Sequence, residues 1–155
     1  MININELKDQ INTKTINLFL LAVATAGIYP ILWLNSNYKI IDKATSSTTA
    51  NDTYIIWIAV CAGLSGAFSG LGEEVLDVIS VILLIALNVL YIVWALRAKK
   101  ALQEYALNTH KIDFKMNGFY TFAFNVYYIN YCINDLPEVQ RKHDVINGTA
   151  VVQEV

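Results

Sequence analysis

Two long apolar runs separated by only three residues constrain this chain more than any other feature. The first run covers residues 54–71, the second covers residues 75–96, and Gly72, Glu73 and Glu74 lie between them. Each run is close to the length of a helix that crosses a bilayer, about 20 residues. Because so short a connection brings the second helix back along the first, the sequence predicts an antiparallel transmembrane hairpin.

The low charge content of the chain agrees with a membrane environment. Only 15% of the 155 residues are charged and 55% are hydrophobic, whereas soluble domains carry about 25% charge. The formal net charge is −2, so no basic excess indicates a nucleic-acid partner. We therefore expect an all-α integral membrane protein whose main partner is the lipid bilayer, with no small-molecule substrate.

Two further apolar segments flank the hairpin at residues 16–34 and 118–134. Pro30 removes a backbone donor inside the first segment, which predicts a kink or break near Ala26. The second segment is short for a span, and three asparagines interrupt it: Asn125, Asn130 and Asn134. Each segment could cross the bilayer or enter and leave on one side as a re-entrant segment. Residues 1–134 are thus expected to form a single membrane domain, followed by a polar, poorly ordered tail over residues 135–155.

Residues 2–11 place apolar side chains on one face at helical spacing, which predicts a short amphipathic helix. Two interpretations are open for it: a helix lying on the membrane surface or a soluble N-terminal turn.

The positions of the basic residues bear on orientation, because Lys and Arg favour the cytoplasmic side of a membrane. If only the hairpin crosses, all eleven basic residues lie on one side and Gly72, Glu73 and Glu74 face outward. If all four segments cross with the N-terminus outside, seven of the eleven are cytoplasmic. The first arrangement is favoured.

Small residues recur along the first hairpin helix, and such residues allow close helix packing in lipid. The residues concerned are Ala59, Ala62, Gly63, Gly66 and Gly70. The favoured interpretation is packing against a neighbouring helix of the same chain. The alternative is an interface between copies of the chain.

Polar residues also occur at the hairpin turn and within its second helix. They are Glu73, Glu74, Asp77, Ser80 and Asn88. Carboxylates favour the positive end of a helix dipole, and polar groups at membrane depth need hydrogen-bond partners. These structural roles are the favoured interpretation, and a polar path through an oligomeric channel is the alternative.

No residue pattern indicates catalysis. His110 and His143 stand alone without ligands at metal spacing, and Cys61 and Cys132 are expected to be buried free thiols. The sequence predicts no enzyme, no metal and no cofactor.

Residues 25–33 resemble the Thr-x-Gly-Ile-Tyr…Trp signature of a family of small bacterial inner-membrane proteins of unknown function. The positions that carry the resemblance are Thr25, Gly27, Tyr29, Pro30 and Trp33. It implies a multi-pass protein of the bacterial inner membrane and transfers no activity. From the residues themselves, Gly27 and Pro30 are expected to bend the helix, and Tyr29 and Trp33 to anchor it at the interface.

Three functions are compatible with these features. A non-catalytic accessory or regulatory subunit that packs against a membrane protein agrees best with the small-residue positions and the absence of catalytic groups. An immunity protein against a membrane-targeting toxin is the first alternative, by association only. A small homo-oligomeric channel or transporter is the second.

Overall fold

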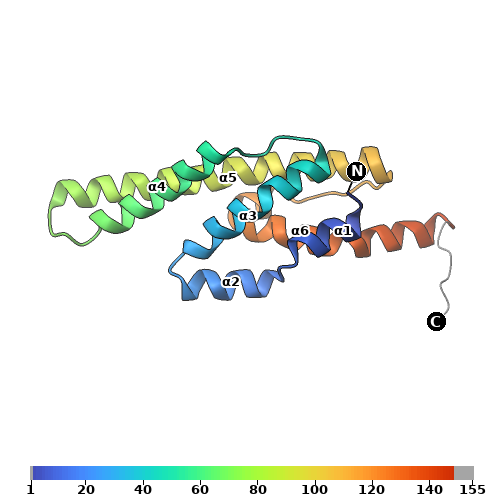
Figure 1. Cartoon of the computed structure of the whole chain (residues 1–155), viewed down its shortest axis with the longest axis horizontal. Coiled ribbons are helices and arrows are strands. Elements are labelled where there is room, and N and C mark those ends of the chain that lie inside the picture. Colours follow the sequence, from blue (N-terminus) through green and yellow to red (C-terminus); the bar gives the residue numbers. More distant parts are fainter. Residues whose placement is uncertain (1, 149–155) are drawn as a thin grey trace.

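The computed structural model describes residues 2–148 as six α-helices, with no strand in that range. In chain order they are α1 (Ile4–Ile11), α2 (Thr15–Ala24), α3 (Ile28–Thr45), α4 (Asp52–Phe68), α5 (Glu74–His110) and α6 (Gly118–Ile146). Figure 1 shows α5 and α6 running along the long axis of the molecule, with the α4–α5 turn at one extreme. The predicted all-α class is confirmed for the described residues.

The predicted hairpin is present as α4 and α5, which lie side by side (Figure 1). With 37 residues, α5 is about 55 Å long, and among the described helices it alone is long and apolar enough to cross a membrane. α4 is apolar but has only 17 residues. Of the two helices expected to span the membrane, only α5 therefore has the required length and composition.

The turn between α4 and α5 depends on backbone conformations that glycine adopts easily. Gly70 and Gly72 have φ angles of +81° and +78°, in the left-handed region where a side chain is strained. The carboxylate of Asp77 accepts a hydrogen bond from the Gly70 N–H at 3.2 Å and so ties α5 back to the turn.

The break predicted near Ala26 is real, but its cause differs from the expectation. Ala26 and Gly27 have φ angles of +48° and +87°, and the Gly27 N–H bonds to the Ala22 carbonyl at 2.8 Å. This is the Schellman pattern that ends a helix, and it turns the chain back from α2 into α3. Pro30 lies in the first turn of α3, where a missing N–H costs nothing, so it does not cause the break.

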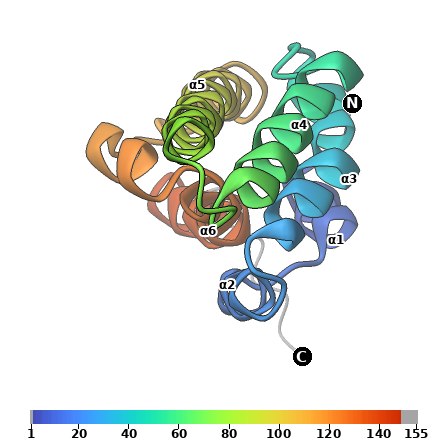
Figure 2. The same ribbon diagram turned by 90° about the vertical axis from the view of Figure 1, so that its left-hand side faces the viewer.

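Most of the buried apolar cluster lies toward the end of the molecule opposite the α4–α5 turn, which we call the core end: α1, α3, α5 from Trp94 onward and α6 from Val126 onward. Figure 2 views the molecule from the other end, with the α4–α5 turn toward the viewer. Ile4, Leu7 and Ile11 of α1 are buried against α3 and α6. The amphipathic face of α1 therefore lies in the protein core, which excludes the surface-lying interpretation of this helix.

α6 begins at Gly118, where the expected segment begins, but it differs from that segment in its middle and beyond its end. Its helical geometry is interrupted at Asn125, with φ of 30° and ψ of −107°. Beyond the interruption it continues past Asn134 to Ile146. A poorly ordered tail from residue 135 was thus the wrong expectation for residues 135–146, and residues 149–155 lie outside the described residues.

Candidate functional site

The most extensive surface feature is a set of exposed apolar side chains, which we call the apolar belt. It covers α2, α4, the first half of α5 and the first turns of α6. Its larger members are Ile16, Phe19, Leu20, Val23, Ile56, Trp57, Val60, Leu64, Val75, Val78, Val81, Ile82, Leu84, Ile85, Val89, Phe119, Phe122 and Phe124. Soluble monomers rarely expose so large an apolar surface.

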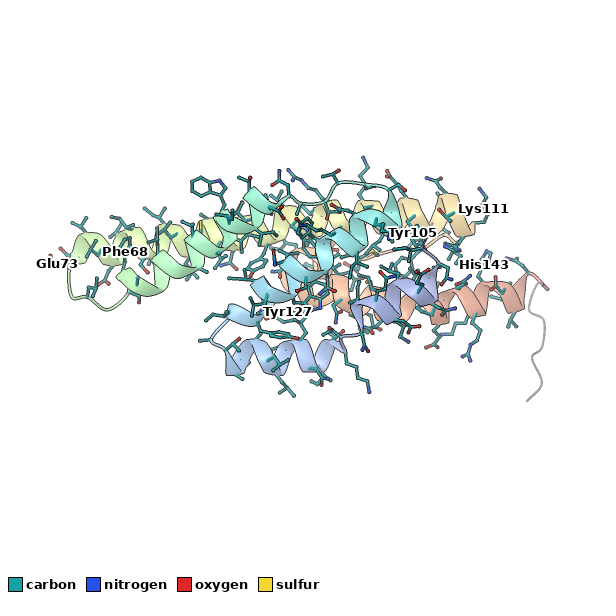
Figure 3. The ribbon with its side chains drawn as sticks, viewed as in Figure 1. Phe68, Glu73, Tyr105, Lys111, Tyr127 and His143 are labelled. Carbon is teal, nitrogen blue, oxygen red and sulfur yellow. The ribbon has the colours of Figure 1, made fainter. Side chains whose placement is uncertain are left out.

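Charge is distributed in the opposite way. No Lys or Arg occurs in residues 16–38, 53–96 or 116–140, the segments that carry the belt. Figure 3 shows Glu73 at the hairpin turn, with Lys111 and His143 at the other end of the molecule. The chain thus separates an apolar region without Lys or Arg from a region that contains all the basic residues.

The small residues of α4 face away from α5. α4 packs through Ile55, Ile58, Cys61 and Ser65, which are buried. In contrast, Ala59, Gly63 and Gly66 are exposed and Ala62 is half-buried, while Gly70 is exposed in the turn beyond the helix. A Cβ atom added at Gly63 or Gly66 would meet no atom within 4 Å. The favoured interpretation, packing within the chain, was therefore wrong for these glycines.

At about 100° per residue, Ala59, Gly63 and Gly66 lie within a sector of about 60° on one flank of α4. We call these three residues the small-residue face. Trp57 and Leu64 lie on the other side of the helix, so the exposed surface of α4 has one flat flank and one bulky flank.

The five polar residues of the hairpin do not form one route. The Ser80 hydroxyl donates a hydrogen bond to the Ser65 carbonyl at 2.7 Å, which joins the apolar parts of α4 and α5. Asp77 holds Gly70 in the turn, and Glu73 and Glu74 are exposed beside it. Asn88 is exposed and donates to the Leu84 carbonyl of its own helix at 2.8 Å, so the expected interhelical bond from Asn88 is not formed within the described residues.

The signature residues build the α2–α3 turn. The Thr25 hydroxyl accepts a hydrogen bond from the Tyr29 N–H at 2.9 Å and donates to the Leu21 carbonyl at 2.7 Å, so it joins the two helices. Tyr29 is half-buried. Trp33 is only 3% exposed and packs edge-to-face on Trp94, with ring centroids 6.3 Å apart. An interfacial anchor was therefore the wrong role for Trp33, which belongs to the core.

Two asparagines of α6 have a role that the sequence did not reveal. The Asn130 amide donates to the Thr13 carbonyl at 3.0 Å and to the Thr15 hydroxyl at 3.1 Å. Asn134 donates to the same Thr13 carbonyl at 2.9 Å. Together they fix the linker between α1 and α2 on α6. The signal was present, because amides inside an aromatic segment need partners, but the sequence did not name the partner.

An ionic cluster joins α3 to the start of α4. The Asp52 carboxylate accepts a hydrogen bond from the Tyr38 hydroxyl and pairs with Lys39 at 3.0 Å. The hydrogen bond from Tyr38 and then that from Lys39 lower the pKa of Asp52. Burial, followed by the bond to Asp52, raises the pKa of Tyr38. The cluster stabilises the junction and holds no group poised for catalysis.

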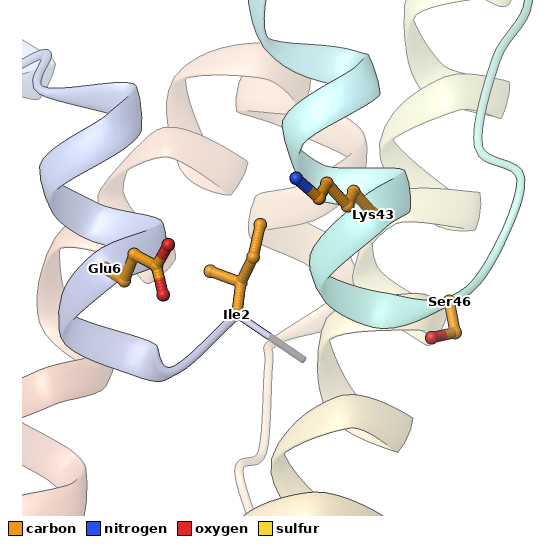
Figure 4. A pocket seen from close by; sticks show the side chains of 4 residues that line it. All are labelled: Ile2, Glu6, Lys43 and Ser46. Atoms are coloured by element: carbon orange, nitrogen blue, oxygen red, sulfur yellow. The ribbon is translucent and has the colours of Figure 1, made fainter.

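A polar depression of about 470 Å³ lies beside the first residues of the described chain. Figure 4 shows the Ile2 side chain between Glu6 of α1 and Lys43 of α3, with Ser46 at the end of α3. The two charges are opposite in sign and exposed, so the depression selects neither anions nor cations.

Chemistry-bearing groups elsewhere in the described chain are isolated. No three His, Cys, Asp or Glu side chains between residues 2 and 148 are placed to hold a metal ion. Cys61 and Cys132 are free and buried, as expected. His110 contacts the hydroxyl of Tyr105 at 3.1 Å, and Tyr105 donates to the Ile2 carbonyl at 2.6 Å. His110 therefore supports the attachment of the N-terminal segment to α5.

No protein-family model, curated protein or solved structure matches this chain. The resemblance of residues 25–33 to the family signature therefore stays a prediction.

Proposed function

We propose that this protein is a multi-pass protein of the bacterial inner membrane that acts without a catalytic site, as an accessory or regulatory subunit of a membrane partner. The apolar belt is the observation that carries the proposal. In the most apolar 18-residue stretch of α5 only 22% of the residues are buried. In water such a surface would drive aggregation, whereas in lipid it is the expected exterior.

The proposed topology follows from the separation of charge along the molecule. The α4–α5 hairpin crosses the bilayer, with Glu73 and Glu74 on the outer side. The α2–α3 hairpin and the first turns of α6 enter the membrane from the inner side, and the exposed Phe119 and Tyr120 lie at the interface, where aromatic side chains are favoured. All eleven basic residues then lie on the cytoplasmic side, in agreement with the distribution of Lys and Arg in membrane proteins.

The small-residue face supports the interaction role. Because a Cβ atom added at Gly63 or Gly66 would meet no neighbouring atom within 4 Å, a helix of another protein can approach the α4 backbone there. Close approach of this kind is a main source of helix association in lipid. Ser80 and Asp77 are engaged in holding the hairpin, which argues against the channel alternative.

The test is native mass spectrometry of the protein extracted gently from its own membrane, with Gly66→Leu as the variant. Leucine at this position leaves the fold intact, since its Cβ meets open space and leucine is a better helix former than glycine by up to about 1 kcal/mol. Ala67→Leu, on an adjacent exposed part of α4, is the matched control. We expect a heteromeric mass in the native protein and in Ala67→Leu, and a monomer in Gly66→Leu.

Two other results would overturn the proposal. A monomer in all three proteins would show that the face has no partner. A homo-oligomer without a second protein would favour the channel alternative.

A further inference from the structure

A groove of about 380 Å³ separates the start of α2 from the interrupted part of α6. Its walls are mainly apolar and include Ile16, Phe19, Phe124 and Tyr127, while Thr15 and Asn125 supply the polar groups. Sites for small apolar ligands have this volume and this combination of apolar walls with a few polar groups. Figure 3 marks Tyr127 beside α2.

The groove exists because α6 is interrupted. Asn125 adopts a φ of 30° and a ψ of −107°, and its side-chain oxygen accepts a hydrogen bond from the next residue's N–H at 2.6 Å. Such a break changes the direction of a helix, so the first turns of α6 diverge from the rest. Below the break, Tyr127 remains packed edge-to-face on Phe19, with ring centroids 6.1 Å apart, and forms the floor.

The size of the groove limits its occupant. Its α2 wall extends from Thr15 to Phe19, about 6 Å of helix axis. A partner helix, about 10 Å wide with its side chains, needs a longer and flatter surface. A single flexible acyl chain fits a short concave channel of this kind.

The surroundings indicate which molecule supplies that chain. Ile16, Phe19 and Phe124 at the rim are exposed members of the apolar belt, so the groove opens onto the surface assigned to lipid. Lys14 directly precedes the groove. No Asp or Glu occurs in residues 10–41 or 114–134, and Lys14 makes no ion pair with any residue in the described range. An exposed lysine thus stands next to the lining residue Thr15 in the chain, and its charge complements an anionic headgroup.

We propose that this groove binds one acyl chain of an anionic phospholipid of the surrounding bilayer, with the headgroup phosphate beside Lys14. The proposal rests on the proposed membrane insertion. It makes α2 and α6 a lipid-specific contact, distinct from the protein contact proposed at α4. The lipid fills the space that the break at Asn125 leaves and covers the polar groups of Thr15 and Asn125 at membrane depth.

The test is photolabelling in phosphatidylcholine vesicles that contain a small fraction of phosphatidylglycerol with a diazirine on its acyl chain. The labelled residues are mapped by mass spectrometry. Ala123→Trp fills the groove from a position on its wall, and Ala67→Trp adds the same bulk to exposed α4. Lys14→Gln removes the charge.

We expect labelling within residues 15–19 and 123–127 that excess unlabelled phosphatidylglycerol competes away and excess phosphatidylcholine does not. Ala123→Trp should lower it about tenfold, equivalent to about 1.4 kcal/mol of binding free energy, and Ala67→Trp should leave it unchanged. Lys14→Gln should remove the preference for phosphatidylglycerol.

Labelling of residues 75–89 serves as the internal reference for membrane insertion. If these residues are labelled while the groove signal is not competed away, the groove contacts only ordinary bilayer lipid and this inference is overturned. If no part of the chain is labelled, membrane insertion itself is overturned.

Discussion

The two halves of α5 are opposites in composition and in burial. From Glu74 to Val93 the helix is almost entirely apolar, and Ser80 is its single buried residue. From Trp94 to His110 the helix contains five charged or basic side chains, yet seven of its residues are buried, among them Trp94 and Leu102. The more apolar half is the exposed half.

This inversion is what the proposed membrane location predicts, namely one helix that faces two solvents. In water, burial follows hydrophobicity, because removing apolar area from water stabilises the fold by about 25 cal/mol per Å². The second half obeys that rule within the core end. The first half violates it unless its surroundings are apolar, since in lipid there is no hydrophobic force that drives helices together. Substitutions in each half can therefore test the two environments separately.

Removing the largest buried side chain of the second half should have the greatest effect. Trp94 is fully buried and packs on Trp33, so Trp94→Ala should lower the free energy of unfolding by about 3–5 kcal/mol. Leu84→Ala in the first half should change it by less than about 0.5 kcal/mol. Denaturant titration in mild detergent measures both. Equal losses of unfolding free energy in the two variants would mean that the two halves of α5 do not differ in their packing.

A charge in the first half tests its surroundings. Ile85 is 60% exposed near the middle of the apolar run, and lysine at such a depth costs about 2.5–3.5 kcal/mol for insertion. Ile85→Lys should therefore reduce the fraction of protein retained in carbonate-washed membranes. Leu107→Lys in the second half, where Leu107 is 52% exposed, is the control and should have no effect. Full membrane retention of Ile85→Lys would mean that Ile85 faces water.

The hydrogen bond between the hairpin helices should contribute a smaller amount. Ser80→Ala removes the bond to the Ser65 carbonyl and should cost about 1 kcal/mol, since interhelical hydrogen bonds in membranes are modest. Ser36→Ala, an exposed serine of α3, controls for the loss of a hydroxyl. The midpoint of thermal unfolding in detergent measures the difference. An unchanged midpoint for Ser80→Ala would show that the bond does not hold the hairpin together.

The smallest effect is expected at the junction of α3 with α4, outside the apolar run. The pKa of Asp52 is lowered in the folded chain, first by its bond from Tyr38. Its stabilising contribution is therefore complete above the unfolded pKa, about 3.9, and is lost as the pH falls through the folded value. Asp52→Asn should flatten the acid limb of the stability profile slightly, and Asp9→Asn should not. Superimposable profiles for native protein and Asp52→Asn would exclude this role.

The sequence predicted the elements that local chemistry determines. The hairpin follows from two apolar runs with a three-residue connection. The break near Ala26 was predicted from Pro30, whereas the positive φ angles of Ala26 and Gly27 produce it. Positions that depend on packing were harder to predict. Periodicity places Ala59, Gly63 and Gly66 on one face of α4, but it cannot say whether that face meets α5.

The errors at other positions have the same origin. A tryptophan near the end of an apolar run has the same sequence pattern whether its side chain lies at the membrane interface or in the protein core. Trp33 lies in the core, where it packs on a tryptophan 61 positions later in the chain. The linker that Asn130 and Asn134 hold is more than a hundred residues away. The groove depends on Asn125, whose backbone conformation the sequence does not reveal.

The accessibility of single cysteines to a thiol reagent reports directly whether the first half of α5 lies within a bilayer. On a background with Cys61→Ala and Cys132→Ala, single cysteines are introduced by Glu73→Cys, Ile85→Cys or Lys100→Cys, and sealed vesicles of known orientation are treated with a membrane-impermeant maleimide. We expect the cysteine at position 73 to react only from the outer side and the cysteine at position 100 to react only from the cytoplasmic side. The cysteine at position 85 should react only after detergent is added. Reaction of position 85 in intact vesicles at the rate of position 100 would contradict this expectation.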